Sequence, residues 1–472
     1  MPYFRRTSRH VQKNTKGGNE PGIKQAGLGS IVGFHFTAPA RNRMTNTLYV
    51  KLDVVETILK RTGIALIDIS GNSYDGATSL QLDGLGNIYV GGVSDANGSL
   101  DFAVVKLNST GSLDTSFGNA GITLIDISGN SRDTAFALQL DSSGNIYVGG
   151  FSNANGSDDI AVVKLNSLGS LDSSFGNAGI ALIDISGNSG DAAFALQLDS
   201  SGNIYVGGFS DANGSDDIAV VKLQPNGSLD TSFGNAGIAL IGVSGDGATS
   251  LQLDGLGNIY VGGVSDANGS NDFAVVKLNS TGSLDSSFGN AGIALIDISN
   301  DIASTLQLDG LGNIYVGGFS NANGSLDFAI VKLQPNGSLD TSFGNAGIAL
   351  IDISGNSDDA AFALQLDGLG NIYVGGVSDA NGSFDGVGDC TVVKLQPNGS
   401  LDTSFGNAGI ALIDINFIIT DSLVGSLQLD SSGNIYVGGI RFVEETSDDS
   451  LDFVVIKLQP NGSLDTSFGD LI

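Results

Sequence analysis

One phrase returns seven times along most of this chain, and that repetition limits what the chain can fold into. The hexapeptide NIYVGG recurs with its tyrosine at Tyr89, Tyr147, Tyr205, Tyr260, Tyr315, Tyr373 and Tyr436. Successive tyrosines are 55 to 63 residues apart, and each copy ends in SFG, with its phenylalanine at Phe117, Phe175, Phe233, Phe288, Phe343, Phe405 or Phe468. Self-similarity at this period predicts a repeat architecture, in which each copy is one structural unit.

Each copy contains four strand candidates bounded by turn residues. In the first copy they are residues 77–83, 87–94, 101–108 and 121–128, which are rich in Val, Ile, Leu and Phe. The DGLG and DANG segments between them contain glycines, which supply the positive φ that tight hairpins need. No stretch of ten residues has helical periodicity, so we expect an all-β body.

A four-stranded unit of this size cannot bury both faces of its sheet alone, so the copies must stack. A β-solenoid is the competing architecture, but its coils are shorter and its GGxGxD calcium repeat is absent. We therefore predict a seven-bladed β-propeller of four-stranded antiparallel blades over residues 63–472. The GIALIDIS at 63–70 has no blade of its own, and we expect it to join the last blade beside residues 452–458 and close the ring.

Charge divides the chain at the start of the repeats. Residues 1–62 contain 11 of the 20 Lys and Arg residues and three acidic residues, whereas residues 63–472 contain nine basic and 47 acidic residues. We expect residues 1–62 to form a basic, partly disordered arm with a degenerate repeat remnant at 49–52. The acidic body would repel nucleic acid and anionic lipid and attract cations.

Other sequence features leave the cellular context open. No run of about 18 apolar residues predicts a membrane-spanning helix. The apolar stretch at 26–36 is interrupted by glycines and His35, which makes an unconvincing signal peptide. Cys390 is the single cysteine, so no internal disulfide forms, and we expect it to be buried and inert. The oligomeric state does not follow from the sequence.

The phrases NGSLDTSFG, DGLGNIYVGG and DFAVVKL, in this order and spacing, resemble the delta-60 repeat family of bacterial-type β-propeller repeats. The resemblance covers about residues 63–472. It implies a seven-bladed propeller, often in secreted or surface-associated proteins, and it implies no catalytic residues. The chain departs from the pattern at Gly242, which replaces the Asp of LIDIS, and in the last copy, where EETSDDS replaces DANGS.

The recurring DANGS loop has a spacing that suits a metal ion. Its oxygens converge around a glycine turn, as in the second half of a calcium loop. The candidate ligands are Asp95, Asn97, Asp101, Asp211, Asn213, Asp217, Asp266, Asn268, Asp272, Asp379, Asn381 and Asp385. The first ligand position falls on Val93 or Phe151, which cannot coordinate, so a solvated hairpin turn is the alternative. We expect no cofactor other than calcium at some of these loops.

One lysine and one aspartate also recur in every copy. The lysines are Lys106, Lys164, Lys222, Lys277, Lys332, Lys394 and Lys457, and the aspartates are Asp114, Asp172, Asp230, Asp285, Asp340, Asp402 and Asp465. Because catalysis needs one distinctive site, seven equivalent pairs are better explained as structural ion pairs.

The functional prediction depends on residue types and motifs of enzymes that the repeat region lacks. No histidine occurs in residues 63–472, which removes the commonest general base and zinc ligand. Paired carboxylates could still hydrolyse glycosides, although the spacing of the sialidase Asp box is missing. The copies diverge at YDG (74–76), at FDGVGDC (384–390), and at NFIITDSLVG and RFVEET in the last blade, and function would be concentrated there.

We therefore predict a propeller that is not an enzyme and that binds or displays a protein or glycan ligand in adhesion or surface assembly. Two alternatives stay open. One is a carboxylate-based carbohydrate-active enzyme, and the other is a structural coat component present in many copies.

Overall fold

The computed structural model describes residues 32–34, 48–50, 63–71, 74–129, 131–187, 189–242, 247–267, 269–355, 357–379, 388–413, 421–444 and 449–469. The chain divides into two units, Met1–Lys60 and Arg61–Ile472. In the first unit, β1 (Val32–Phe34) pairs antiparallel with β2 (Leu48–Val50). The rest of the expected basic arm lies outside the described residues.

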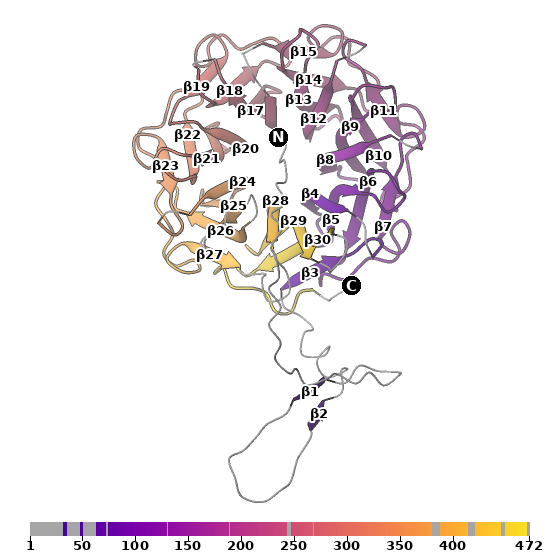
Figure 1. Cartoon of the computed structure of the whole chain (residues 1–472). Coiled ribbons are helices and arrows are strands. Elements are labelled where there is room, and N and C mark those ends of the chain that lie inside the picture. The colour runs from indigo at the N-terminus through magenta and orange to yellow at the C-terminus, as the bar shows by residue number, and fades with distance from the viewer. Residues whose placement is uncertain are drawn as a thin grey trace, which may run out of the picture. The chain divides into compact units, whose positions relative to one another are not determined.

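The second unit is a ring of seven four-stranded antiparallel sheets, and it confirms the predicted seven-bladed propeller (Figure 1). The strands nearest the axis are β4 (Asp75–Leu82), β8 (Asp133–Leu140), β12 (Asp191–Leu198), β16 (Gly247–Leu253), β20 (Ile302–Leu308), β24 (Asp359–Leu366) and β28 (Asp421–Leu429). The second strands are β5 (Ile88–Ser94), β9 (Ile146–Ser152), β13 (Ile204–Ser210), β17 (Ile259–Ser265), β21 (Ile314–Ser320), β25 (Ile372–Ser378) and β29 (Ile435–Glu444). The third strands are β6 (Asp101–Leu107), β10 (Asp159–Leu165), β14 (Asp217–Leu223), β18 (Asp272–Leu278), β22 (Asp327–Leu333), β26 (Asp389–Leu395) and β30 (Asp449–Leu458). The outer strands are β7 (Ile122–Ile125), β11 (Ile180–Ile183), β15 (Ile238–Ile241), β19 (Ile293–Ile296), β23 (Ile348–Ile351), β27 (Ile410–Ile413) and β3 (Ile64–Ile67). Within the described residues, no helix is long and apolar enough to cross a membrane.

The ring closes as the sequence predicts. Strand β3 is the outer strand of the last blade and pairs antiparallel with β30, with Ile64 opposite Ile456 and Ile67 opposite Phe453. Gly63 extends the closure, because its carbonyl accepts a hydrogen bond from the Lys457 backbone at 2.8 Å. The closure gives β30 a neighbour on both sides, so that β30 is not left as an open edge of the last blade.

The outer strands are shorter than the sequence predicts. We expected residues 121–128 to form one strand, but β7 ends at Ile125. The reason lies in the next residues: the Asp126 carboxylate accepts a hydrogen bond from the Gly129 backbone, and the Ile127 N–H donates to Asp133 Oδ2 at 2.8 Å. Residues 126–128 therefore begin the loop to the next blade.

The hydrophobic core lies between neighbouring blades. Tyr89 and Val104 of the first blade pack in one cluster with Leu138 and Val163 of the second. The glycine pair of NIYVGG permits this approach, since a Cβ at Gly91 would lie 3.1 Å from the Leu138 side chain. Each blade thus buries one face of its sheet against the next.

The SFG phenylalanine anchors the connector that leads to each outer strand. Phe117 is buried and meets the Tyr89 ring edge to face, with their centroids 6.1 Å apart. Lys106 Nζ lies 5.2 Å from the centre of the same Tyr89 ring and forms an ion pair with Asp114 at 2.9 Å. All seven copies contain this ion pair, which confirms its structural interpretation.

Candidate functional site

The central channel is the first candidate site. It is a cavity of about 180 Å³ lined by the seven innermost strands. Each strand contributes one glutamine, namely Gln81, Gln139, Gln197, Gln252, Gln307, Gln365 and Gln428. No Asp or Glu is among its described lining residues, so the channel offers amides and hydroxyls but no acid or base.

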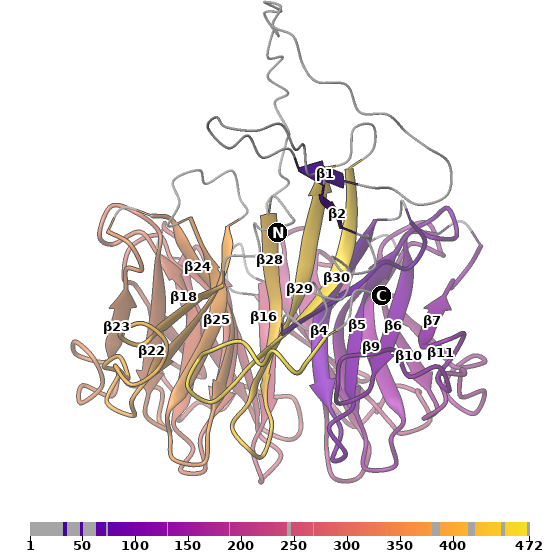
Figure 2. The same cartoon turned by 90° about the horizontal axis from the view of Figure 1, so that it is seen from below.

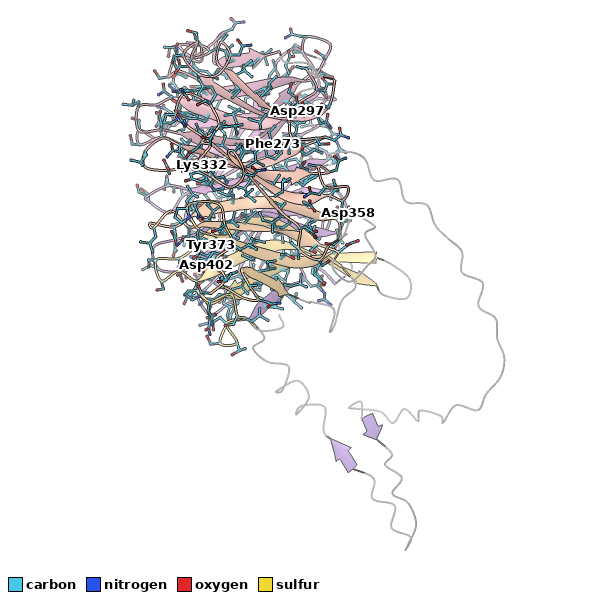
Figure 3. The ribbon with its side chains drawn as sticks, turned by 90° about the vertical axis from the view of Figure 1, so that its left-hand side faces the viewer. Phe273, Asp297, Lys332, Asp358, Tyr373 and Asp402 are labelled. Atoms are coloured by element: carbon cyan, nitrogen blue, oxygen red, sulfur yellow. The ribbon has the colours of Figure 1, made fainter. Side chains whose placement is uncertain are left out.

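The carboxylates gather instead where one blade meets the next. Asp101 begins β6, Asp126 follows β7, and Asp133 begins β8 of the following blade. Because β6 and β7 are antiparallel and the chain then turns into β8, these three positions lie at the same end of the sheets. Figure 3 shows Asp297 and Asp358 toward this end, with Lys332 and Asp402 toward the other.

One carboxylate oxygen from each of these three aspartates lies within 4.8 Å of the others. Among the described residues the same arrangement occurs at four blade junctions, and we call these groups the junction triads. They are Asp101, Asp126 and Asp133; Asp159, Asp184 and Asp191; Asp272, Asp297 and Asp301; and Asp327, Asp352 and Asp359. In every triad the first and third residues are buried and the middle one is exposed.

Hydrogen bonds fix the buried members of the first triad. The Asn97 amide donates to Asp101 Oδ2 at 3.0 Å, and the Ser99 hydroxyl donates to Asp101 Oδ1 at 3.2 Å. Burial raises the pKa of Asp101 in spite of these bonds, and the charges of Asp126 and Asp133 raise it further.

Asp133 is less completely satisfied than Asp101. It is fully buried, and its Oδ2 accepts the Ile127 backbone hydrogen bond. Its Oδ1 is buried and has no hydrogen-bond partner. A buried carboxylate oxygen without a donor is costly, so this oxygen is the unexplained feature of the junction.

In three DANGS loops of the described chain, the first aspartate accepts a backbone hydrogen bond from the segment before an inner strand. The Asp95 carboxylate accepts the Tyr74 N–H at 2.7 Å, and that of Asp211 accepts the Gly190 N–H at 2.7 Å. The Asp379 carboxylate likewise accepts a hydrogen bond from the Asp358 backbone N–H at 3.1 Å.

The remaining predicted ligands divide into three groups. Asn97 and Asn213 donate to Asp101 and Asp217 from within their own loops. Asp101 and Asp272 lie in junction triads, whereas Asp217 and Asp266 belong to none. Asn268, Asn381 and Asp385 lie outside the described residues.

Sequence reasoning missed the second and third members of each triad. Asp126 belongs to LIDIS, which was assigned to a strand, and Asp133 opens the next blade. The middle aspartate recurs at a fixed offset after the NIYVGG tyrosine, and the third follows it by seven residues in three triads and by four in the triad of Asp297 and Asp301. This recurrence was the signal that could have identified them. Their convergence with Asp101 becomes visible only once the blades are placed side by side.

The junction between the last and first blades differs from the four triads. By position in the repeat, Asp452, Asp68 and Asp75 correspond to the three triad residues. Here an arginine is added: Arg441 Nη1 on β29 lies 3.1 Å from Asp452 Oδ2, and both side chains are 12% exposed. Nε of Arg441 is buried without a hydrogen-bond partner.

Burial shifts the pKa of both Asp452 and Arg441 at this junction. Burial raises the pKa of Asp452 to about 6, Arg441 opposes that rise, and Asp68 and Asp75 add to it. Burial also lowers the pKa of Arg441. Asp452 therefore keeps its proton in mildly acidic solution, beside the exposed carboxylate of Asp68.

The same junction carries features that the other blades lack. Strands β29 and β30 are ten residues long, whereas their counterparts β5 and β6 have seven. Figure 2 shows both strands reaching beyond the face formed by the other blades. Tyr74, 46% exposed, lies in a backbone bridge with Leu451, next to Asp452. This is where the sequence diverges, at YDG and RFVEET.

Cys390 offers no second chemistry. It is buried, and burial raises the pKa of its thiol to about 12, so the reactive thiolate does not form at neutral pH. The expectation of an inert cysteine agrees with this position.

A family model described as a domain of unknown function (DUF5122) beta-propeller matches the chain seven times. The matched residues are 86–117, 142–175, 200–233, 257–288, 312–343, 370–405 and 431–468. Together they make up just over half of the chain, one match in each blade. No curated protein sequence matches the chain.

Solved structures share the fold. The polysaccharide lyase Uly1 is 9% identical with a TM-score of 0.50, and the match covers 85% of this chain and all of the lyase. A protein of unknown function from Dyadobacter fermentans is 11% identical over 85% of this chain and 99% of its own, with a TM-score of 0.41. An exo-beta-1,3-galactanase from Clostridium thermocellum is 13% identical over 86% and 98%, with a TM-score of 0.32.

The likeness to the lyase corrects the expectation that the chain is a non-catalytic binding or display scaffold and not an enzyme. The match spans 85% of this chain and all of the lyase, so a propeller of similar fold is an enzyme in that protein. The absence of histidine was taken as evidence against an enzyme, but carboxylates alone are sufficient for glycan chemistry. At 9% identity the likeness concerns the fold, and the site must be argued from this chain's own residues.

Proposed function

The chain belongs to the DUF5122 β-propeller family, and we propose that this member is a carboxylate-based carbohydrate-active enzyme. Its site is the junction of β30, β3 and β4, with Asp452, Asp68 and Arg441 as the working residues. We further propose that the repeats are of the delta-60 type, on the basis of the NGSLDTSFG phrase.

The observation that carries the proposal is the pair of unlike carboxylates at the junction where Arg441 joins the cluster. Asp452 has a pKa raised by burial to about 6, and Asp68 lies exposed nearby in the same charge network. Glycoside hydrolysis needs one carboxyl group that is protonated and one that is ionised. A catalytic site also needs to be unique, which the seven lysine pairs and the four junction triads are not.

The residues have separate roles in this chemistry. Asp452 donates its proton to the glycosidic oxygen as the bond breaks, and Asp68 supplies the carboxylate that acts on the anomeric carbon directly or through water. Arg441 positions Asp452 through its Nη1, which lies 3.1 Å from Asp452 Oδ2. The exposed Tyr74 ring offers a flat apolar surface with a polar edge beside them.

The negative charge of the propeller indicates which class of glycan it can bind. The propeller has nine basic and 47 acidic residues, so its field repels a polyuronate and attracts a neutral or cationic glycan. We therefore propose hydrolysis of a neutral or amino-sugar polysaccharide.

The test is a hydrolysis assay on neutral glucans, galactans and chitosan, with the release of reducing ends measured for the full chain and for Asp452→Asn. We expect Asp452→Asn to lower kcat about 100-fold or more, because the leaving oxygen loses its proton donor. Activity of the unaltered enzyme should fall as the pH rises through about 6, where Asp452 loses its proton.

Asp217→Asn is the matched control, because Asp217 occupies the same repeat position at another junction and should leave the activity unchanged. Equal losses in the two variants, or no hydrolysis of any polymer by the intact chain, would refute the proposal. An unsaturated product from a polyuronate, detected by its ultraviolet absorbance, would show an eliminating enzyme and also contradict it.

A further inference from the structure

We propose that the four junction triads are calcium sites, so that the propeller binds at least four divalent cations between its blades. These sites are separate from the proposed glycan site. They differ also from the predicted DANGS sites, because only the last aspartate of a loop takes part.

The triads of Asp101, Asp159 and Asp327 carry negative charge that no basic side chain of the described repeat region compensates. All nine basic residues of the repeat region have partners elsewhere among the described residues. The seven recurring lysines pair with the aspartates near the SFG phrase, Arg132 pairs with Asp158 at 2.8 Å, and Arg441 pairs with Asp452. The triads that contain Asp101, Asp159 and Asp327 thus hold three carboxylates each, two of them buried, and none of these nine basic side chains pairs with them. Like charges this close repel strongly away from water.

An unsatisfied buried oxygen is further evidence for a ligand, independent of the charge. Oδ1 of Asp133 is fully buried and has no hydrogen-bond donor, although Oδ2 of the same carboxylate has one. At the next junction Asp191 is better satisfied, because Ile185 and Ser189 donate to its Oδ2 at 2.8 and 3.1 Å and Ser210 also hydrogen-bonds to its carboxylate. The buried oxygen of Asp133 that no donor satisfies indicates a ligand that the protein's own groups do not replace.

Among the described residues, the chain alters the triad at two junctions. At one, Arg441 supplies a positive charge within the protein. At the other, Gly242 replaces the middle aspartate, and a Cβ there would lie 3.2 Å from Asp217 Oδ1, so a longer side chain would reach the cluster. The middle carboxylate is therefore placed to contact the first one, and losing it leaves an incomplete site.

The donor set selects the cation. Three carboxylates provide hard, anionic oxygens, and no His or Cys is present to favour zinc or copper. Calcium accepts six to eight oxygens in a flexible geometry, and carboxylates that bind through both oxygens supply most of them. The exposed middle aspartate, such as Asp126, gives the ion access from solvent.

The experiment is equilibrium dialysis of the chelator-stripped full chain against calcium chloride, with thermal melting in parallel. The intact protein should bind at least four calcium ions, one for each triad. Asp126→Asn and Asp184→Asn should each remove one ion, and the double variant two. Asparagine keeps the oxygen that accepts the loop hydrogen bond, so these variants should fold.

Matched variants separate a site from general negative charge. Asp216→Asn removes an exposed carboxylate beside the incomplete junction at Gly242, and it should leave the number of bound ions unchanged. Asp211→Asn does the same for a DANGS loop that belongs to no triad. Gly242→Asp, which restores the middle carboxylate, should add one ion.

Calcium should raise the melting temperature of the intact protein by several degrees, and by less in the double variant. The proposal fails if the stripped protein binds no calcium at millimolar concentration, if Asp126→Asn and Asp184→Asn bind as many ions as the intact chain, or if Asp211→Asn loses an ion.

Discussion

At the scale of single residues, the repeated polar positions have structural roles that composition alone does not reveal. The Asp114 carboxylate accepts hydrogen bonds from Ser116 and pairs with Lys106, which in turn lies against the Tyr89 ring. A side chain at Gly92 would meet the Gly76 carbonyl at 2.0 Å, so the second glycine of NIYVGG cannot be replaced without moving the inner strand. Many of the residues that recur in the copies are therefore explained by packing and by structural ion pairs.

The alanine of the NAG phrase is strained in the same way in every copy that the structure describes. Ala236 has a φ of 55°, in the left-handed region that costs an alanine about 1–2 kcal/mol. Replacement by glycine removes this cost but adds flexibility to the unfolded chain, worth about 0.4–1 kcal/mol. We expect Ala236→Gly to raise the free energy of unfolding by about 0.5 kcal/mol, as measured by urea denaturation.

The control for this prediction is Ala239→Gly in β15, where the backbone is extended and the side chain is buried. That change should lower the free energy of unfolding by about 1 kcal/mol. If Ala236→Gly destabilises the protein as much as Ala239→Gly does, the alanine is not strained.

At the scale of the elements, the sequence predicts strands well and loops poorly. The inner three strands of the first blade lie within two or three residues of their predicted ranges, because their apolar runs are bounded by glycine turns. The outer strand was predicted too long, since LIDIS is apolar enough for a strand but its aspartate turns the chain. The junction triads could not be predicted from the DANGS loops, because spacing within one loop says nothing about residues contributed by the next blade.

The closure by β3 makes a prediction at this scale. A chain that begins at Arg61 keeps β3, whereas one that begins at residue 72 removes it and leaves β30 unpaired. We expect the shorter chain to melt at a temperature at least 5 °C lower and to aggregate through its open edge. Equal melting temperatures and equal light scattering for the two truncations would contradict a structural role for β3.

At the scale of the whole molecule, charge governs behaviour. The seven recurring aspartates are held ionised, and the pKa of Asp114 falls to about 2 because Ser116 donates to it and Lys106 pairs with it. The same causes lower the pKa of Asp172, Asp230, Asp285 and Asp402 to about 2. The two sides of the molecule thus differ, with these pairs toward one face and the carboxylate clusters toward the other (Figure 3).

The stability of the fold should follow these shifts. A carboxylate whose pKa is lowered on folding stabilises the protein fully above its unfolded pKa of about 4, and this stabilisation disappears as the pH falls to about 2. Asp452 acts in the opposite direction, because its raised pKa of about 6 favours folding as the pH falls from about 6 to about 4. In chelator, we expect the free energy of unfolding to hold or rise from pH 7 to pH 4 and then to fall steeply toward pH 2. A steady fall from pH 7 downwards would contradict the assignment of the ion pairs.

The blade junctions have the same backbone arrangement but different charges. We propose that four of them bind calcium and that the junction of the last and first blades is the catalytic site. A crystal structure grown with calcium, with the anomalous signal of the ion recorded, tests this most directly. We expect anomalous peaks between the carboxylates of all four junction triads, and none beside Gly242 or between Arg441 and Asp452. Peaks within the DANGS loops, or a protein crystallised in millimolar calcium with no peak at any triad, would contradict it.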